Sequence, residues 1–213
     1  MTSTSIQHAI AQAQAAADAV TPDQGQIVPF GRPISLMDNL VGSFAVDTWL
    51  KVKPYGMTIG KDTTTLFDRL VFRIDMSTVV YCRRVRYGNP AEYRTTYDGV
   101  HDFRGGLWAD TVARARAIDP KCQGDYRSAD IPLIAAEDIV AKDGTVLADQ
   151  GGKIGYAPAI TGWHGWADLI RRLVAAGINP EHDLIEVTAR VQYNKNPSGE
   201  WGTVAFEGFE AVA

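Results

Sequence analysis

Hydrophobic and polar residues alternate along several segments of the chain, which is the pattern of half-buried β-strands. Over 43–54, Leu50 and Val52 fall on one face, whereas Trp49, Lys51 and Lys53 fall on the other. Similar alternation predicts strands over 64–77, 78–87, 183–193 and 201–209. A short polar loop separates the last two strands, so we expect them to pair as a hairpin.

Two segments show helical spacing instead. Over 105–119, Trp108 and Ala115 fall on one face, and over 165–177 an apolar stripe runs through Trp166 and Leu169. Residues 120–162 show no clear period, and we interpret them as an irregular insert.

The N-terminal region differs in composition from the rest. Residues 4–20 are rich in Ala and Gln and predict a short helix, whereas 21–42 contain three prolines and three glycines and predict an extended linker. We therefore divide the chain into an N-terminal helix or arm with its linker, 1–42, and a single β-rich domain, 43–213.

The order of these elements predicts a mainly β chain with two helices, of the α+β class. Three strands, a helix and a final hairpin are the order of an OB-like antiparallel β-barrel, here with an enlarged helical and irregular insert. A two-layer α+β sandwich fits the same order and remains the alternative.

The composition of the chain indicates the cellular compartment in which we expect the protein. The 213-residue chain has a formal net charge of −4, no apolar run of transmembrane length and no secretory signal pattern at its N-terminus. Its two cysteines do not form a disulfide framework, so we expect a reduced, cytoplasmic protein with no membrane partner. A negative net charge argues against bulk coating of duplex DNA, but it permits a local basic groove for single strands.

The sequence VVYCRRVRYGNPAEYRTTYDG, residues 79–99, concentrates basic and aromatic side chains, and we call it the Arg/Tyr segment. Four arginines and one glutamate within 81–94 give a local charge of +3. Tyrosine rings stack on bases and arginines bind phosphates, so an exposed face of this kind suits a single-strand groove. The alternative is an amphipathic strand whose tyrosines pack at a core edge and whose arginines pair with nearby acids.

Two loops add Lys next to aromatic residues, at 51–62 and at 193–201, and we expect them to flank the same face as the Arg/Tyr segment. The nucleic-acid-binding residues predicted from these three segments are Lys51, Lys53, Tyr55, Tyr81, Arg83, Arg84, Arg86, Tyr87, Tyr93, Arg94, Tyr97, Lys195 and Trp201.

Signatures of catalysis and of metal binding are missing from the sequence. The four histidines are scattered, there is no Cys/His cluster, and the Gly-rich stretch 149–166 lacks the spacing of a phosphate-binding loop. We therefore predict no enzyme activity, no cofactor and no metal. The stretch 149–166 is interpreted as a mobile flap or a partner-contacting loop.

The element order and the aromatic, basic strand over 43–209 resemble OB-fold single-stranded DNA-binding proteins of the phage or plasmid kind. The resemblance implies non-sequence-specific coating of single-stranded DNA, or RNA, in replication or recombination. The acidic tail with which bacterial members recruit partners has no counterpart in the terminal sequence FEGFEAVA. We also expect a homo-oligomer, formed through 1–42.

Two other functions fit the same residues. One is a structural or assembly subunit, such as a virion or shell component, whose N-terminal arm lies on a neighbouring subunit. The other is an enzyme or a small-ligand-binding protein, which requires Trp163, His164 and Trp166 to converge on a pocket below the 149–166 segment.

Overall fold

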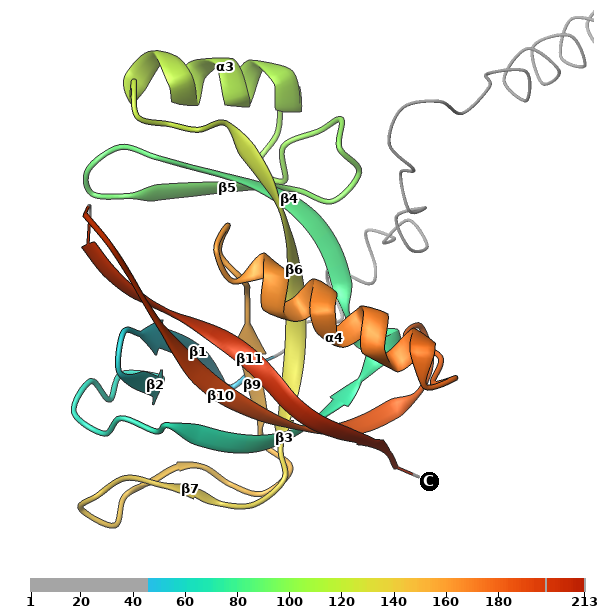
Figure 1. The fold of residues 1–213 in the computed structure, drawn as a ribbon. Helices are drawn as coiled ribbons and strands as arrows, with labels where there is room; N and C mark the ends of the chain where they lie inside the picture. The colour runs from blue at the N-terminus through green and yellow to red at the C-terminus, as the bar shows by residue number, and fades with distance from the viewer. Residues whose placement is uncertain (1–45, 198, 213) are drawn as a thin grey trace, which may run out of the picture. The chain divides into compact units, whose positions relative to one another are not determined.

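The computed structural model describes residues 46–197 and 199–212 (Figure 1). These residues form eleven strands and two α-helices, so the predicted mainly β, α+β class is confirmed. The helix and linker predicted within 1–42 lie outside the described residues. Among the described helices, none is long and apolar enough to cross a membrane.

Four strands form the centre of the sheet: β3 (Arg69–Asp75), β6 (Asp125–Ala135), β9 (Lys153–Tyr156) and β10 (Leu184–Asn196). Their spatial order is β10-β3-β6-β9, and each neighbouring pair is antiparallel. Since the fourth strand returns to lie beside the first, the arrangement is a Greek key. Helix α4 (Trp163–Ala175) connects the third strand of this unit to the fourth.

The remaining strands of the main path extend the sheet at both sides. Strand β11 (Gly199–Ala211) pairs with β10 as the predicted hairpin. On the other side, β1 (Thr48–Lys53) runs parallel to β9 and pairs antiparallel with β2 (Gly56–Ile59). The sheet is therefore mixed and open, and no hydrogen-bonded pairing among the described strands closes it into a barrel.

Strand β11 nevertheless passes very close to β1. A Cβ atom on Gly202 would lie 2.1 Å from the carbonyl oxygen of Lys53, so only glycine permits this approach. The two sides of the sheet thus meet by backbone packing.

A second group of elements lies on the first half of β6. Strands β4 (Val80–Tyr87) and β5 (Glu92–Thr96) form a hairpin, and β4 pairs with β6 from Asp125 to Asp130. Helix α3 (Trp108–Ile118) packs on this hairpin. The short strands β7 (Ile139–Val140) and β8 (Val146–Ala148) form a separate hairpin, and a 3-10 turn, η1 (Met76–Thr78), follows β3.

The described residues contain two apolar cores. The larger core joins the inward side chains of the main sheet to α4, whose Trp166, Leu169 and Leu173 are fully buried. The smaller core, beneath α3, consists of Val85, Tyr87, Trp108 and Ala115. Each helix therefore covers one part of the long sheet.

The interpretation of 120–162 as irregular is wrong, because this segment supplies β6 and β9 at the centre of the sheet. All residues from Ser128 to Leu133 are buried, so the polar alternation that marks a half-exposed strand is lost. The first predicted strand, 43–54, is confirmed as β1 over its described part. It pairs with β2 and β9, and it does not pair with β3, which lies in the second predicted strand, 64–77.

Packing of α4 against the sheet gives the first prediction. Leu173→Ala removes a fully buried side chain and should lower the free energy of unfolding by about 2–5 kcal/mol. Val174→Ala, one residue further on the same helix, removes a side chain that is 59% exposed and should change it by less than about 0.5 kcal/mol. Urea unfolding of both variants checks this; equal effects would contradict the packing of α4.

Candidate nucleic-acid interface

The Arg/Tyr segment folds as the β4–β5 hairpin, continued by the turn that follows β5. Residues Val85 and Tyr87 face α3 and belong to the smaller core. Arg84 and Arg86 point to the opposite face, where they lie beside Thr95 and Tyr93 of β5. The face that carries Val85 and Tyr87 is thus covered by α3.

Three of the four arginines of the segment pair with aspartates. Arg83 lies 2.5 Å from Asp125, and Arg84 forms an ion pair with Asp130. The third, Arg94, lies 2.9 Å from Asp102. The prediction that Arg94 faces solvent is wrong, since its side chain is only 17% exposed, and the local charge of +3 is largely neutralised.

The tyrosines of the segment are also mostly engaged. Tyr87 is buried and donates a hydrogen bond to Glu92, and Tyr97 donates one to Asp130. Tyr81 packs edge-on against Trp163 of α4, with ring centroids 6.4 Å apart. The predicted solvent exposure of Tyr87 is therefore wrong, because α3 covers it, and Tyr81 is half-buried beside α4.

Arg86 and Tyr93 remain exposed. The Tyr93 side chain is 51% exposed, and its hydroxyl accepts a hydrogen bond of 3.2 Å from Arg86 Nε. No carboxylate in the described part of the chain forms an ion pair with Arg86. These two residues can contact a ligand directly, and so can Arg83, whose side chain is 39% exposed although it pairs with Asp125.

A buried polar network fixes this hairpin to the rest of the sheet. Arg84 donates to Ser128 and Asp130 on β6, and Ser128 in turn donates to the carbonyl of Pro158, which precedes α4. Burial raises the pKa of the nearby Cys82 thiol to about 12, so it stays protonated at neutral pH. The role of this network is structural, since its polar atoms satisfy one another.

The two Lys-bearing loops lie next to each other. Tyr55, between β1 and β2, stacks on Tyr193 of β10 with ring centroids 5.3 Å apart and planes 15° from parallel. The Tyr55 hydroxyl donates a 2.5 Å hydrogen bond to Glu200, which also pairs with Lys195 at 3.0 Å. We call Tyr55, Tyr193, Lys195 and Glu200 the tip cluster.

The tip cluster combines exposed rings with both signs of charge. Tyr55 is 66% exposed and Tyr193 is 43% exposed. The hydrogen bond from Tyr55, and then that from Lys195, lower the pKa of Glu200, so this carboxylate is ionised at neutral pH. Since Val191 and Val204 lie further along the same face, the stacked rings also cover one end of the larger core.

The other predicted residues of these loops divide between two faces. Lys51 and Lys53 donate hydrogen bonds to the carbonyls of Gly60 and Thr63, and their charges are not paired with any carboxylate of the described residues. Trp201 lies opposite Asn194 in the hairpin register, on the other face from Lys195. Lys195 and Trp201, although predicted from the same loop, therefore lie on opposite faces of the hairpin.

The small-ligand site below 149–166 does not form. Trp166 is fully buried against Phe206, Trp163 packs on Tyr81, and His164 is exposed on α4. The segment is not a flap, because it contains strand β9 and the start of α4.

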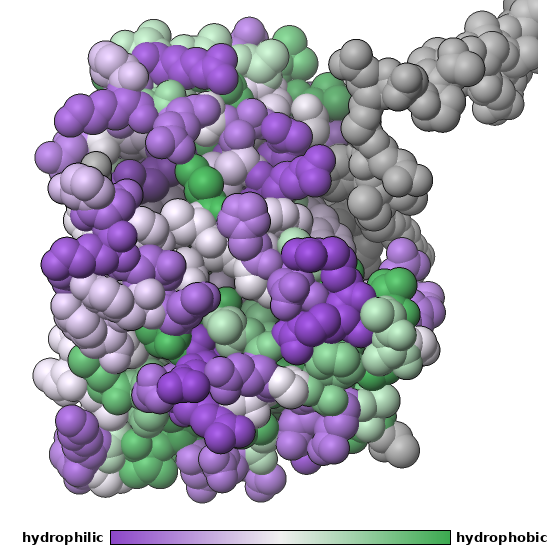
Figure 2. Space-filling model, in the orientation of Figure 1, coloured by the Kyte–Doolittle hydropathy of each residue, from purple (hydrophilic) through white to green (hydrophobic). Residues whose placement is uncertain are grey.

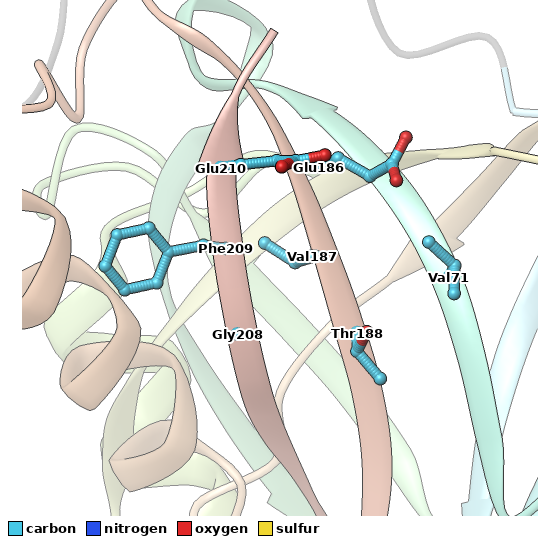
Figure 3. Close-up of a pocket in the computed structure, with 7 residues that line it drawn as sticks. All are labelled: Val71, Glu186, Val187, Thr188, Gly208, Phe209 and Glu210. Carbon is cyan, nitrogen blue, oxygen red and sulfur yellow. The ribbon is translucent and has the colours of Figure 1, made fainter.

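An open pocket of about 290 Å³ lies elsewhere, on β3, β10 and β11 (Figure 3). The carboxylates of Glu186 and Glu210 stand on adjacent strands at one end of it, and Phe209 points away toward α4. Its polar groups include no nucleophile next to a base. Across the described residues, no group of His, Cys, Asp and Glu side chains could hold a metal ion.

Comparisons with protein-family models, with curated proteins and with solved structures found no match to this chain.

The carboxylate of Asp102 joins the Arg/Tyr segment to α3. It accepts hydrogen bonds from Arg94 and from Thr111 on the helix, and its side chain is fully buried. Burial alone would raise its pKa, but the hydrogen bonds from the Arg104 N–H, Thr111 and Arg94 outweigh this effect and lower it.

Because the pKa of Asp102 is lower in the folded chain than its unfolded value of about 3.9, its contribution to stability is complete above about pH 5 and is lost as the pH falls below 3.9. Asp102→Asn should lower the free energy of unfolding by about 2–4 kcal/mol at pH 7 and reduce the loss of stability between pH 5 and 3. Urea unfolding at several pH values checks this. Asp68→Asn, an exposed aspartate 3.7 Å from Arg190, is the control; the same pH dependence in both variants would refute the role of Asp102.

Proposed function

We propose that the protein binds single-stranded nucleic acid, most naturally DNA, without sequence specificity. The observation that carries this proposal is the tip cluster, in which exposed tyrosine rings from two segments far apart in the sequence stack beside Lys195. Exposed ring faces bind bases of any type by stacking, and nearby ammonium groups bind the phosphates.

The topology of the Greek key supports an OB-like arrangement. Strands β3, β6 and β9 are followed by α4 and then by the β10–β11 hairpin, which is the element order of an OB-like barrel. In this interpretation β9 is the third strand of the OB-like unit. It pairs with β1 instead of with the last strand, β11, so the barrel stays open.

Ligands of OB-folds bind across the second and third strands, between the loop that joins strands one and two and the loop that joins strands four and five. Here the first of these connections contains the Arg/Tyr segment, and the second is the tip of the β10–β11 hairpin, which carries Lys195. In Figure 1 the tips of both hairpins point to the same side of the view. Figure 2 shows that hydrophilic residues cover most of this face over the β4–β5 hairpin.

The paired arginines limit the strength of this interface. Of the predicted cations, Lys51, Lys53 and Arg86 have no carboxylate partner among the described residues, and Lys195 shares its charge with Glu200. Four phosphate contacts correspond to a slope of about −3 in a plot of log affinity against log salt for a single strand. Binding should therefore be moderate and carried largely by stacking.

The test is fluorescence anisotropy of a labelled oligo-dT of about 30 nucleotides, which spans roughly two OB-type sites. The intact chain is titrated at low and moderate salt, with a duplex of equal length as control. Salt-sensitive binding to the single strand alone is expected. Absence of binding at low salt would refute the proposed function.

Substitutions in the tip cluster have opposite predicted effects. Tyr55→Ala should weaken oligo-dT binding about 5-fold or more, because it removes a stacking ring, whereas Tyr55→Phe keeps the ring and should bind at least as well as the wild type. Glu200→Gln should tighten binding about two- to fivefold, because it removes one negative charge and frees Lys195. The same titration measures all three, and Arg171→Ala on α4 is the charge control; a loss of affinity in Glu200→Gln would count against phosphate binding at the tip.

A second function, that of an assembly subunit, is favoured by a different surface. Val100, Phe103 and Leu107, in the loop between β5 and α3, are 54%, 62% and 52% exposed. Exposed apolar side chains that gather in one loop are typical of a protein contact. An oligomer held by such a contact would resist salt, unlike a complex with nucleic acid.

Light scattering of the intact chain tests the assembly function. If this loop forms the contact, Phe103→Ser with Leu107→Ser should lower the molar mass in solution to that of the monomer. Ile118→Ser, which changes an isolated side chain that is 58% exposed at the end of α3, should leave it unchanged. A monomeric wild type would exclude this function for the loop.

A further inference from the structure

Trp49 of β1 occupies an unusual position on the outer face of the sheet. It is 42% exposed, although the neighbouring Leu50 is buried in the larger core. Trp49 lies opposite Gly155 of β9 in the parallel pairing of these strands. A tryptophan ring offers a large apolar face, so an exposed one can contact a ligand.

The indole ring lies directly on the backbone of Gly155. A Cβ atom at this glycine would come within 2.8, 2.9 and 3.0 Å of the ring atoms Cε3, Cδ2 and Cζ3. Three ring atoms at nearly equal distances place the ring flat over the strand. One face of the ring is therefore covered by β9, and the other is turned outward.

Two lysines lie on the same face as the ring. Lys51 follows Trp49 by two residues along β1, and Lys153 precedes Gly155 by two residues along β9, so the alternation of each strand places them with Trp49. Both are exposed. Among the described residues, the carboxylate that hydrogen-bonds to this region of β1 and β9 is that of Asp47. It accepts a hydrogen bond of 3.0 Å from the backbone N–H of Lys153.

We propose that Trp49, lying on Gly155 and flanked by Lys51 and Lys153, is a stacking site for one unstacked base of a single-stranded nucleic acid. The outward ring face takes the base, and the two ammonium groups bind the adjacent phosphates. The inference rests on the proposed function and adds a position outside the Arg/Tyr segment and the tip cluster. A structural explanation also exists, because an aromatic ring can simply shield a glycine within a sheet.

The experiment follows tryptophan fluorescence and anisotropy together while the intact chain is titrated with oligo-dT. A base stacked on Trp49 should quench part of the emission, and Trp49→Phe, which keeps a ring over Gly155, should lose that part of the quenching. Trp49→Ala should weaken binding about 5- to 140-fold, which is the factor that corresponds to stacking of one base. Lys51→Ala and Lys153→Ala should each make the salt slope shallower by about one unit.

The outcomes separate the two proposals. Binding of oligo-dT to the wild type, with quenching lost in Trp49→Phe, supports the site. The wild type could also bind oligo-dT while Trp49→Phe keeps the same quenching and the variants change affinity less than twofold. Trp49 would then only shield Gly155, and the proposed function would still stand. Absence of oligo-dT binding at low salt overturns both. The Phe variant keeps the test decisive if the Ala variant does not fold.

Discussion

Strand β6 pairs with different strands along its two halves, and the rest of the described structure depends on this constraint. Its first half pairs with β4, and its second half pairs with β3 and β9. The buried ion pair of Arg84 with Asp130 lies where one set of partners gives way to the other. A buried charge without a partner is costly, so this pair favours one register of β4 on β6 over its alternatives.

Pairing of arginine with aspartate also explains how an acidic protein accommodates four arginines in one hairpin. The aspartates of β6 and of the loop before α3 neutralise most of them, so these arginines hold the hairpin in place. Besides Arg86, the accessible cations come from other elements, namely Lys51 and Lys53 of β1 and Lys195 at the tip of β10–β11. A ligand would therefore meet a scattered set of charges with aromatic rings between them.

The sequence predicted the longer strands that have one exposed face, and it missed strands that are buried on both faces or short, such as β5. Alternation located β1 over its described part, β4 and the β10–β11 hairpin, and helical spacing located α4. It failed for β6, which is buried on both faces, and for the short, Gly-containing β9. The sequence could not identify the partner of Arg84 either, because Asp130 is 46 residues away along the chain and local spacing carries no information about such contacts. By contrast, alternation did place Trp49 on the face of Lys51, but only the fold shows that Gly155 lies under its ring.

Strand β1 has a consequence for the order in which the chain acquires its structure. It pairs with β9, which comes much later in the sequence. The hydrogen bond between Asp47 and Lys153, for example, joins residues that are 106 positions apart. During synthesis, the β1–β2 hairpin emerges long before β9 has been made. By contrast, β10 and β11 are joined by a short turn and can pair as soon as both have emerged. Completion of the sheet around β1 is thus a late, long-range event, and the outer face that carries Trp49 exists only once the chain has been made as far as β9, shortly before α4.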